Sequence, residues 1–297
     1  MTQDSRLSAF GFRKIPKGEP TVTHDSGLST PDSRLVTHDP RPKVVAAIPC
    51  FNTEPFIAEV VSKARKYVDQ VIVIDDGSRD GTAEAARAAG AVVVSHEKNR
   101  GKGAAMKTAV ENTDADIIIF LDGDGQHNPE DIPKIIEPIL RDEADLAIGS
   151  RCLPESKASI SPLTRRFSNN LASFVISAII SFLLPSAALF NRLIRLPMLT
   201  QKSQTTRPKL KWTKITDCTS GFRAVRRESW QKFNFTSEGF QIETEMIYEA
   251  AKNKFVIAEA PISCNWNSEI SRLSIFRDGL RTLKLLSGKL INDIRGR

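Results

Sequence analysis

Short runs of apolar, β-branched residues alternate with longer stretches of helical spacing between residues 43 and 150. The runs predict strands at Val44–Ile48, Gln70–Ile74, Ala91–Ser95, Asp116–Leu121 and Asp145–Ile148. The stretches between them repeat apolar residues every three or four positions and predict helices at Glu54–Tyr67, Thr82–Ala89, Lys102–Asn112 and Pro129–Arg141. Continuous apolar strands between amphipathic helices are typical of an α/β fold with a mainly parallel sheet covered on both faces. We therefore expect ligands at the carboxyl ends of the strands.

The first 42 residues differ in composition from the rest of the chain. They are rich in Ser, Thr, Asp, Pro and Gly, and the string DSRL occurs twice in them. Such a segment buries too little apolar surface to fold alone, so we expect a disordered tail at 1–42 and a folded domain at 43–297. No apolar segment near Met1 has the pattern of a secretory signal, which predicts that the chain begins in the cytosol.

Composition and charge narrow the function classes. The apolar share of 40% and the charged share of 26% are those of an ordinary folded protein. The four cysteines lie far apart without a CxxC pair, which excludes a zinc-finger or disulfide-framework pattern and favours a reducing compartment. The net charge of +7 is uneven: residues 151–214 hold eleven Lys and Arg and one acidic residue, whereas residues 43–150 hold more acidic than basic residues. Residues 151–214 therefore account for the excess of positive charge.

That basic segment also contains the most apolar stretch of the chain, Leu171–Phe190, which has no charged residue. Its flanks are basic, with arginines at 165, 166, 192 and 195. Basic and apolar residues together favour a lipid surface over nucleic acid. The stretch is long enough to span a bilayer, but Pro185 divides it, so we expect interfacial or re-entrant helices within 160–200. Helices buried inside the domain are the alternative.

A second amphipathic surface helix is expected over residues 270–290. Leucine and phenylalanine residues alternate there with arginine and lysine at helical spacing. Packing of the apolar face on the core would explain the same pattern nearly as well.

Two of the predicted strands end in acidic loops. The second strand runs into Asp75 and Asp76, where a carboxylate could hold a ribose hydroxyl or a base N–H, although a turn with a helix cap fits equally. The fourth strand runs into Asp122-Gly123-Asp124-Gly125-Gln126-His127. Carboxylates two positions apart on an extended loop point the same way, which suits a divalent cation and the diphosphate that it carries. The spacing of an EF-hand is absent, which disfavours a structural calcium loop.

Two further residues near these loops have open interpretations. His127 is either a ligand beside the acidic loop or a hydrogen-bonded structural residue. Gly101-Lys102-Gly103 does not complete the phosphate-loop pattern GxxxxGK[ST], so we expect a helix start with a solvated lysine there. A contact of Lys102 with phosphate is the lesser alternative.

Taken together, the motifs resemble glycosyltransferase family 2, and within it the dolichyl-phosphate mannose synthase and polyprenyl-phosphate glycosyltransferase branch. The resemblance extends over about Lys43–Asn267 and implies a GT-A fold with interfacial helices inserted. It rests on six motifs in order: Ile48-Pro49-Cys50-Phe51-Asn52, Asp75-Asp76-Gly77-Ser78 with Asp80-Gly81-Thr82, Asp122 to His127, Gly149-Ser150-Arg151, Asp217-Cys218-Thr219-Ser220-Gly221-Phe222-Arg223, and Phe240-Gln241-Ile242-Glu243.

The resemblance implies a role for each matching residue. The nucleotide sugar would be bound by Pro49, Phe51, Asn52, Glu54, Asp76 and Asp122. A Mg²⁺ or Mn²⁺ ion on the donor diphosphate would be held by Asp122, Asp124 and Gln126. A phosphate of the donor or acceptor would be bound by Arg151, Arg165, Arg166 and Ser220. One departure is that the family often reads Pro-x-Tyr-Asn-Glu after the first strand, whereas here Thr53 follows Asn52 and Glu54 comes one place later.

The chemistry of such a reaction depends on the acceptor. A phosphate acceptor is already an anion and needs no strong base, so Asp124, Arg151 and the metal would align the reactants and stabilise the departing nucleoside diphosphate. Direct displacement would invert the anomeric centre. A sugar hydroxyl would have to give its proton to a carboxylate, for which Asp217 and Glu243 are the candidates. Their structural alternatives are a turn cap for Asp217 and a solvent-facing helix position for Glu243.

We therefore expect an inverting, metal-dependent glycosyltransferase that moves glucose or mannose from a UDP- or GDP-linked donor to polyprenyl or dolichyl phosphate. It would work at the cytosolic face of a membrane as a peripheral or monotopic protein. A second hypothesis is a family 2 enzyme with a soluble or glycan acceptor. A third is a non-catalytic basic protein that binds membranes or nucleic acid. We expect no nucleic-acid partner, because a phosphate-backbone binder would not gather carboxylates at strand ends.

Overall fold

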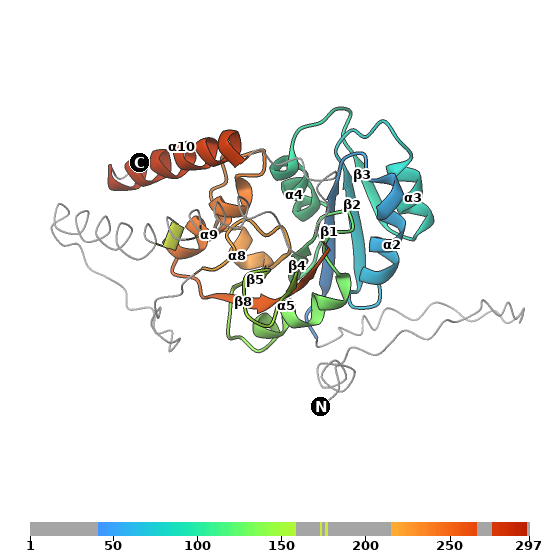
Figure 1. The fold of residues 1–297 in the computed structure, drawn as a ribbon, viewed down its shortest axis with the longest axis horizontal. Coiled ribbons are helices and arrows are strands. Elements are labelled where there is room, and N and C mark those ends of the chain that lie inside the picture. Colours follow the sequence, from blue (N-terminus) through green and yellow to red (C-terminus); the bar gives the residue numbers. More distant parts are fainter. Residues whose placement is uncertain (1–40, 159–172, 174–175, 178–214, 266–274, 296–297) are drawn as a thin grey trace, which may run out of the picture.

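The structure is a computed structural model that describes residues 41–158, 173, 176–177, 215–265 and 275–295 (Figure 1). The strands are β1 (Val44–Cys50), β2 (Gln70–Asp75), β3 (Val92–Ser95), β4 (Ile117–Phe120), β5 (Leu146–Ser150), β6 (Lys157–Ala158), β7 (Arg223–Arg226), β8 (Ile257–Pro261) and β9 (Ser263–Cys264). The helices are α2 (Glu54–Ala64), α3 (Thr82–Ala88), α4 (Lys102–Glu111), α5 (Ile132–Leu140), α8 (Arg227–Trp230), α9 (Ile242–Lys252) and α10 (Ile275–Ile294), with a 3₁₀ turn η1 at Pro129–Asp131.

Seven of the strands form one sheet in the order β3-β2-β1-β4-β7-β5-β8. Only β7 runs against its neighbours β4 and β5; the remaining pairs in this sheet are parallel. The chain builds β1, β2 and β3 outward in one direction and then returns to place β4 on the other side of β1. Such a reversal of strand order opens a crevice at the carboxyl ends of the two strands that flank it.

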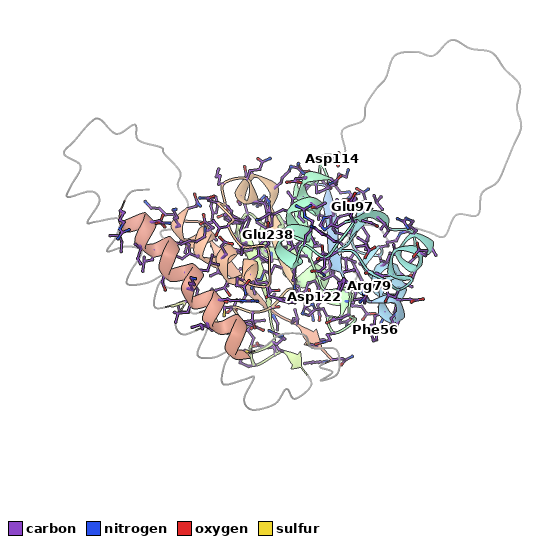
Figure 2. The ribbon with its side chains drawn as sticks, turned by 90° about the horizontal axis from the view of Figure 1, so that it is seen from above. Phe56, Arg79, Glu97, Asp114, Asp122 and Glu238 are labelled. Atoms are coloured by element: carbon purple, nitrogen blue, oxygen red, sulfur yellow. The ribbon has the colours of Figure 1, made fainter. Side chains whose placement is uncertain are left out.

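Helices cover both faces of this sheet because its strands are apolar on both sides. Successive side chains of a strand point to opposite faces, so Val45 and Ala47 of β1 pack with α4, α8 and α9, whereas Val44, Ala46 and Ile48 pack with α2, α3 and α5. The two resulting cores sandwich the sheet. Figures 1 and 2 place α2 and α3 at one end of the molecule and α10 at the other.

The predicted α/β fold is confirmed, with five predicted strands and four predicted helices present near their expected positions. The helix predicted at Glu54–Tyr67 ends earlier, at Ala64, where the chain turns toward β2. The antiparallel strand β7 was not predicted. Its buried sequence Arg223–Arg226 is short and begins with a charged residue, so it lacks the apolar run that identifies its neighbours.

The segments predicted to meet a membrane are described only in part. Most of Leu171–Phe190 lies outside the described residues, as do Arg165 and Arg166. At its beginning, Ile176 is buried in the core, and the Ser173 hydroxyl accepts a hydrogen bond from Cys218 N. In the described part of the chain, no helix combines the length and apolarity needed to cross a bilayer. The helix expected at 270–290 is present as α10.

Phe120 tests the packing of the central strands. It is fully buried, and its ring lies 5.2 Å from that of Trp230. We expect Phe120→Ala to lower the free energy of unfolding by about 3–5 kcal/mol, through lost burial and the cavity left behind. On the edge strand β3, Val92 is 47% exposed, and Val92→Ala should change stability by no more than about 0.5 kcal/mol. Urea unfolding followed by circular dichroism measures the free energy of unfolding of both variants. Equal losses of stability in the two variants would contradict the assigned core.

Candidate active site

A cavity of about 430 Å³ lies at the carboxyl ends of β1 and β4, where the strand order reverses. In Figure 2, Asp122 occupies the middle of the molecule, between α10 and the helices that cover the first strands. Most of the residues implicated by sequence line this cavity: Pro49, Phe51, Asn52, Asp76, Asp122, Asp124, Gln126, Arg151 and Glu243. It is also lined by Lys102, His127, Thr219, Gly221 and Phe240.

The acidic loop after β4 has the compact form that its glycines allow. Asp124 Oδ1 accepts a hydrogen bond from Gln126 N at 3.0 Å, and its Oδ2 accepts one from Gln126 Nε2 at 3.1 Å. Burial, together with the negative charge of Asp122, raises the pKa of Asp124 to about 6. His127 is buried beside the loop, and this burial lowers its pKa to about 4, so the imidazole is neutral at physiological pH.

Lys102 links the acidic loop to helix α9. Its ammonium group contacts Asp122 Oδ1 and lies 2.5 Å from Glu243 Oε1. Burial opposes the charge of this lysine, but the two carboxylates raise its pKa above the ordinary value; the same contact lowers the pKa of Asp122 against the effect of burial. The predicted helix start at Lys102 is confirmed, whereas the expected solvation is wrong, because the side chain is only 9% exposed.

Gly221 leaves the space that this contact needs. A Cβ atom at this position would lie 2.5 Å from Lys102 Nζ and 2.6 Å from Asp122 Oδ2. Any larger residue would therefore push the lysine and the carboxylate away from their present positions. The contact between Lys102 and Asp122 therefore requires a residue without a Cβ atom at position 221.

Arg151 and Asp217 form a buried ion pair beside the cavity. Arg151 Nε lies 2.7 Å from Asp217 Oδ2, and Arg151 Nη2 lies 2.8 Å from Oδ1. Nη2 also donates to Thr219 Oγ1 at 3.0 Å. Asp217 has no solvent exposure, and Arg151 lowers its pKa even though burial acts in the opposite direction. Two parallel hydrogen bonds fix the plane of the guanidinium group, which faces the cavity.

Asp76 lines the cavity but is already bonded to the loop before α4. Its Oδ1 lies 2.7 Å from His96 Nδ1 and accepts from Arg100 N at 2.9 Å, and its Oδ2 accepts from Gly101 N at 2.8 Å. Gly101 has φ 96°, a left-handed conformation that favours glycine. The carboxylate therefore shapes the loop that leads into Lys102. No sequence signal pointed to His96, whose partner lies 20 positions away.

Three residues with implied roles lie away from the cavity lining. Glu54 is exposed, and its Oε2 accepts from Gly81 N at 2.9 Å. Ser220 is buried, and its carbonyl oxygen accepts from Arg223 Nε at 2.6 Å. Asp217 is connected to the cavity through Arg151 and Thr219, which line it. The solvent-facing position considered for Glu243 is wrong, because it is 3% exposed and packs against Lys102.

The charges at the cavity fit a divalent cation. Among the residues that the structure describes, four carboxylates line it, from Asp76, Asp122, Asp124 and Glu243, and two cationic side chains do, from Lys102 and Arg151. Within the described ranges, Asp124 has no cation at ion-pairing distance, and no three His, Cys, Asp or Glu side chains form a complete metal cage. Mg²⁺ commonly takes one or two carboxylates and completes its shell with substrate phosphates and water. The donor set therefore fits a metal that arrives with a diphosphate.

Comparison with known families and curated proteins gives a consistent result. The model of the family described as "Glycosyl transferase family 2" matches residues 45–233. The chain is 29% identical over 238 residues to the UDP-N-acetylglucosamine–dolichyl-phosphate N-acetylglucosaminyltransferase of Methanococcus voltae, covering 72% of this chain and 82% of that protein. It is 26% identical over 238 residues to the polyprenol monophosphomannose synthase of Mycolicibacterium smegmatis, covering 75% and 78%.

Solved structures share the fold. The glucosyl-3-phosphoglycerate synthase of Mycobacterium tuberculosis, crystallised in complex with Mg²⁺ and UDP, superposes with a TM-score of 0.58 at 20% sequence identity. The match covers 86% of this chain and 80% of that one. This likeness confirms the expected GT-A fold of the chain.

Lys102→Met tests the contact between the acidic loop and α9. Removing the ammonium group leaves the buried carboxylate of Glu243 and the partly exposed one of Asp122 without their shared cation, which we expect to lower stability by about 2–4 kcal/mol. Because a divalent cation can replace the lost charge, Mn²⁺ should raise the Tm of this variant more than that of the unchanged protein.

Thermal unfolding in EDTA and in Mn²⁺ measures this difference. Lys98→Met is the matched control, since the Lys98 side chain is exposed on the preceding loop. An equal rise in Tm with Mn²⁺ in all three proteins would show that the metal does not replace the charge of Lys102.

Proposed function

We propose a reaction for this chain from one established premise: the chain belongs to glycosyl transferase family 2 and is a glycosyltransferase. The proposed reaction is transfer of a hexose, glucose or mannose, from a UDP- or GDP-linked donor to a polyprenyl or dolichyl phosphate, with inversion at the anomeric carbon. Membership of an enzyme family argues against a non-catalytic basic protein. The names of the two curated relatives, which contain dolichyl phosphate and polyprenol monophosphomannose, support a lipid phosphate as acceptor.

One observation carries the proposal: an acidic loop and two fixed cations face the same cavity. Asp122 and Asp124 offer oxygens for a divalent cation, while Lys102 and Arg151 offer positive charge for phosphate groups. A nucleoside diphosphate with its metal needs both kinds of group within a few ångströms. The cavity volume of about 430 Å³ falls in the range of small-molecule sites.

The state of the two candidate bases supports a phosphate acceptor over a sugar hydroxyl. Asp217 is fully buried, and both of its oxygens bind Arg151. Glu243 is held by Lys102 through Oε1. The ion pair with Arg151 lowers the pKa of Asp217, which makes this carboxylate a weaker base. An acceptor that arrives as an anion does not need such a base.

Each residue then has a defined task. Pro49 lies near the end of β1, and Phe51 and Asn52 follow that strand; all three line the cavity and would contact the nucleotide. Arg151, held flat by Asp217, would bind a phosphate oxygen and stabilise charge on the leaving nucleoside diphosphate. Lys102 would do the same from the opposite side once the donor binds. In the displacement, an acceptor phosphate oxygen forms a bond to the anomeric carbon as the bond from that carbon to the diphosphate oxygen breaks.

The metal would be held by Asp122, Asp124 and Gln126. When bound, it supplies Lewis-acid stabilisation of the diphosphate leaving group. The Mg²⁺ and Mn²⁺ ions named in the structures of similar fold support this assignment. The carboxylates of Asp122 and Asp124 would then share a cation.

We place this reaction at the cytosolic face of a membrane, with the chain attached as a peripheral or monotopic protein. A polyprenyl phosphate keeps its chain in the bilayer and its phosphate at the surface, so the enzyme must reach that surface. In this scheme residues 1–42 are a tail, residues 43–297 form the catalytic domain, and residues 160–200 and 270–290 contribute interfacial helices. Arg165 and Arg166 belong to the first of these segments and would bind phosphate at headgroup level.

The test is transfer of label from a panel of radioactive nucleotide sugars into organic-extractable material, with polyprenyl phosphate present and with or without EDTA. We expect one donor to label the lipid, EDTA to abolish the labelling, and Asp124→Asn to reduce it by about 100-fold or more. Asp142→Asn, the same change at an exposed carboxylate just after the end of α5 and outside the cavity lining, is the matched control and should behave like the unchanged protein.

The competing acceptor makes a distinct prediction. Labelling of a soluble sugar or glycan with no labelling of lipid would overturn the lipid acceptor and leave the enzyme class intact. Labelling of lipid in EDTA, or by the Asp124→Asn variant at the full rate, would overturn the metal assignment.

A further inference from the structure

Helix α10 has an apolar face that points away from the protein. Six large apolar side chains are exposed among the described residues, and four of them lie on α10: Leu280, Leu283, Ile291 and Ile294, with exposures of 70%, 52%, 47% and 39%. At about 100° per residue, the four lie within a sector of about 80° on the helix surface. They form one stripe, interrupted at its centre by the exposed Ser287, which we call the outer stripe.

The opposite side of α10 is fixed to the protein by polar contacts. Leu286 is buried in the core, and Lys289 Nζ lies 2.9 Å from Glu245 Oε1 and 2.6 Å from Glu249 Oε1 of α9. Farther along, the Tyr248 hydroxyl donates to Asp293 Oδ2 at 2.6 Å. The helix cannot roll its outer stripe inward without breaking these contacts. The exposure of the stripe is therefore built into the fold.

Basic residues border the outer stripe along one edge. Arg281, Lys284 and Arg295 are exposed and lie next to the stripe on the helix surface, about 20–80° beyond it. An apolar stripe beside a row of cations is the pattern of a helix that lies in the interface of a bilayer, with the cations at the level of anionic headgroups.

Charge distinguishes a lipid surface from the other surfaces that could cover the stripe. Within the chain, the apolar stretch Leu171–Phe190 has arginines on both flanks, and these would meet the basic row with like charge. A second copy packed about a two-fold axis would bring two basic rows toward one interface. Anionic phospholipid complements both the stripe and its basic edge.

The strand that precedes α10 in the sequence lies beside the cavity. Strands β6 and β9 pair in parallel beside the cavity, and Asn265 N donates to Gln126 O at 2.9 Å just after β9. The chain that follows β6 leads into the basic and apolar segment 159–214, and the chain that follows β9 leads to α10. The strand β6 that precedes segment 159–214 begins six residues after Arg151, and the strand β9 that precedes α10 in the sequence is its partner.

We propose that the outer stripe of α10 and its basic edge form a membrane-docking surface for anionic phospholipid. The purpose of this surface, which is to bring the cavity to a lipid acceptor, rests on the proposed function. The surface itself is inferred from the exposed face of α10 and its basic edge. It assigns membrane contact to α10, and this assignment does not depend on segment 159–214.

Sedimentation of the full chain with phospholipid vesicles tests the proposal. The vesicles are pure phosphatidylcholine or phosphatidylcholine mixed with phosphatidylglycerol. We expect binding to the anionic vesicles, at least a tenfold loss of affinity in the double variant Leu280→Ser/Leu283→Ser, and loss of the preference for anionic lipid in Lys284→Glu/Arg295→Glu. Val92→Ser, which removes an exposed apolar side chain from β3, is the matched control and should bind normally.

The outcomes separate this proposal from the proposed function. Unchanged vesicle binding in the double leucine variant would overturn the docking surface, as would conversion of a dimer to a monomer in that variant with vesicle binding intact. Transfer to a short-chain, water-soluble prenyl phosphate should be the same in the variant and the unchanged protein, because α10 does not line the cavity. If that transfer is absent from both proteins, the proposed function fails, and vesicle binding still decides the docking surface.

Discussion

The burial of charged groups at the carboxyl ends of the strands is the constraint on which the site depends. Lys102 lies between Asp122 and Glu243, and Arg151 lies against Asp217, so three carboxylates from distant segments are held by two cations. A buried charge without a partner is costly, and each of these contacts therefore also joins segments of the fold. The loop after β4 is joined to α4 and α9, and the end of β5 is joined to the segment that precedes β7. The site and the packing of the domain share the same interactions.

Asp124 lines the same cavity without such a pairing. It is largely buried beside Asp122 and lacks a cation among the described residues. In the cavity this carboxylate lies beside a second one, Asp122, and Lys102 contacts only the latter, so the position of Asp124 suits a cation that comes from outside the chain. Under the proposed function, a metal that arrives with a diphosphate would supply that partner, and the diphosphate would bring the anionic groups that Lys102 and Arg151 can bind. The same charge balance explains why an acidic cavity can be a phosphate site.

The sequence predicted five of the seven strands of the sheet, and four of these five are buried along nearly their whole length. Runs such as Ile117–Phe120 are apolar at every position, and the helices between them have a clear period, so neither requires knowledge of distant contacts. The short strand β7 lacked such a run. Its position is set by pairing with β4 and β5, which are more than seventy positions upstream.

The site was predicted where chemistry is local and missed where it depends on distant partners. Asp122 and Asp124 stand together in one motif, and their position after a strand was enough to indicate their place. Lys102 was expected to be solvated because Glu243, its partner, is 141 positions away. The pairing of Asp217 with Arg151 across 66 positions likewise could not be read from spacing, although both residues were identified by resemblance.

The most direct measurement of the central claim is the location of Mn²⁺ in crystals grown with a nucleoside diphosphate, determined from its anomalous scattering. We predict a single strong peak bonded to carboxylate oxygens of the loop at 122–126, with the diphosphate in the cavity between Lys102 and Arg151. A diphosphate bound elsewhere, or bound in the cavity with no metal at this loop, would contradict the role that we assign to the buried charges.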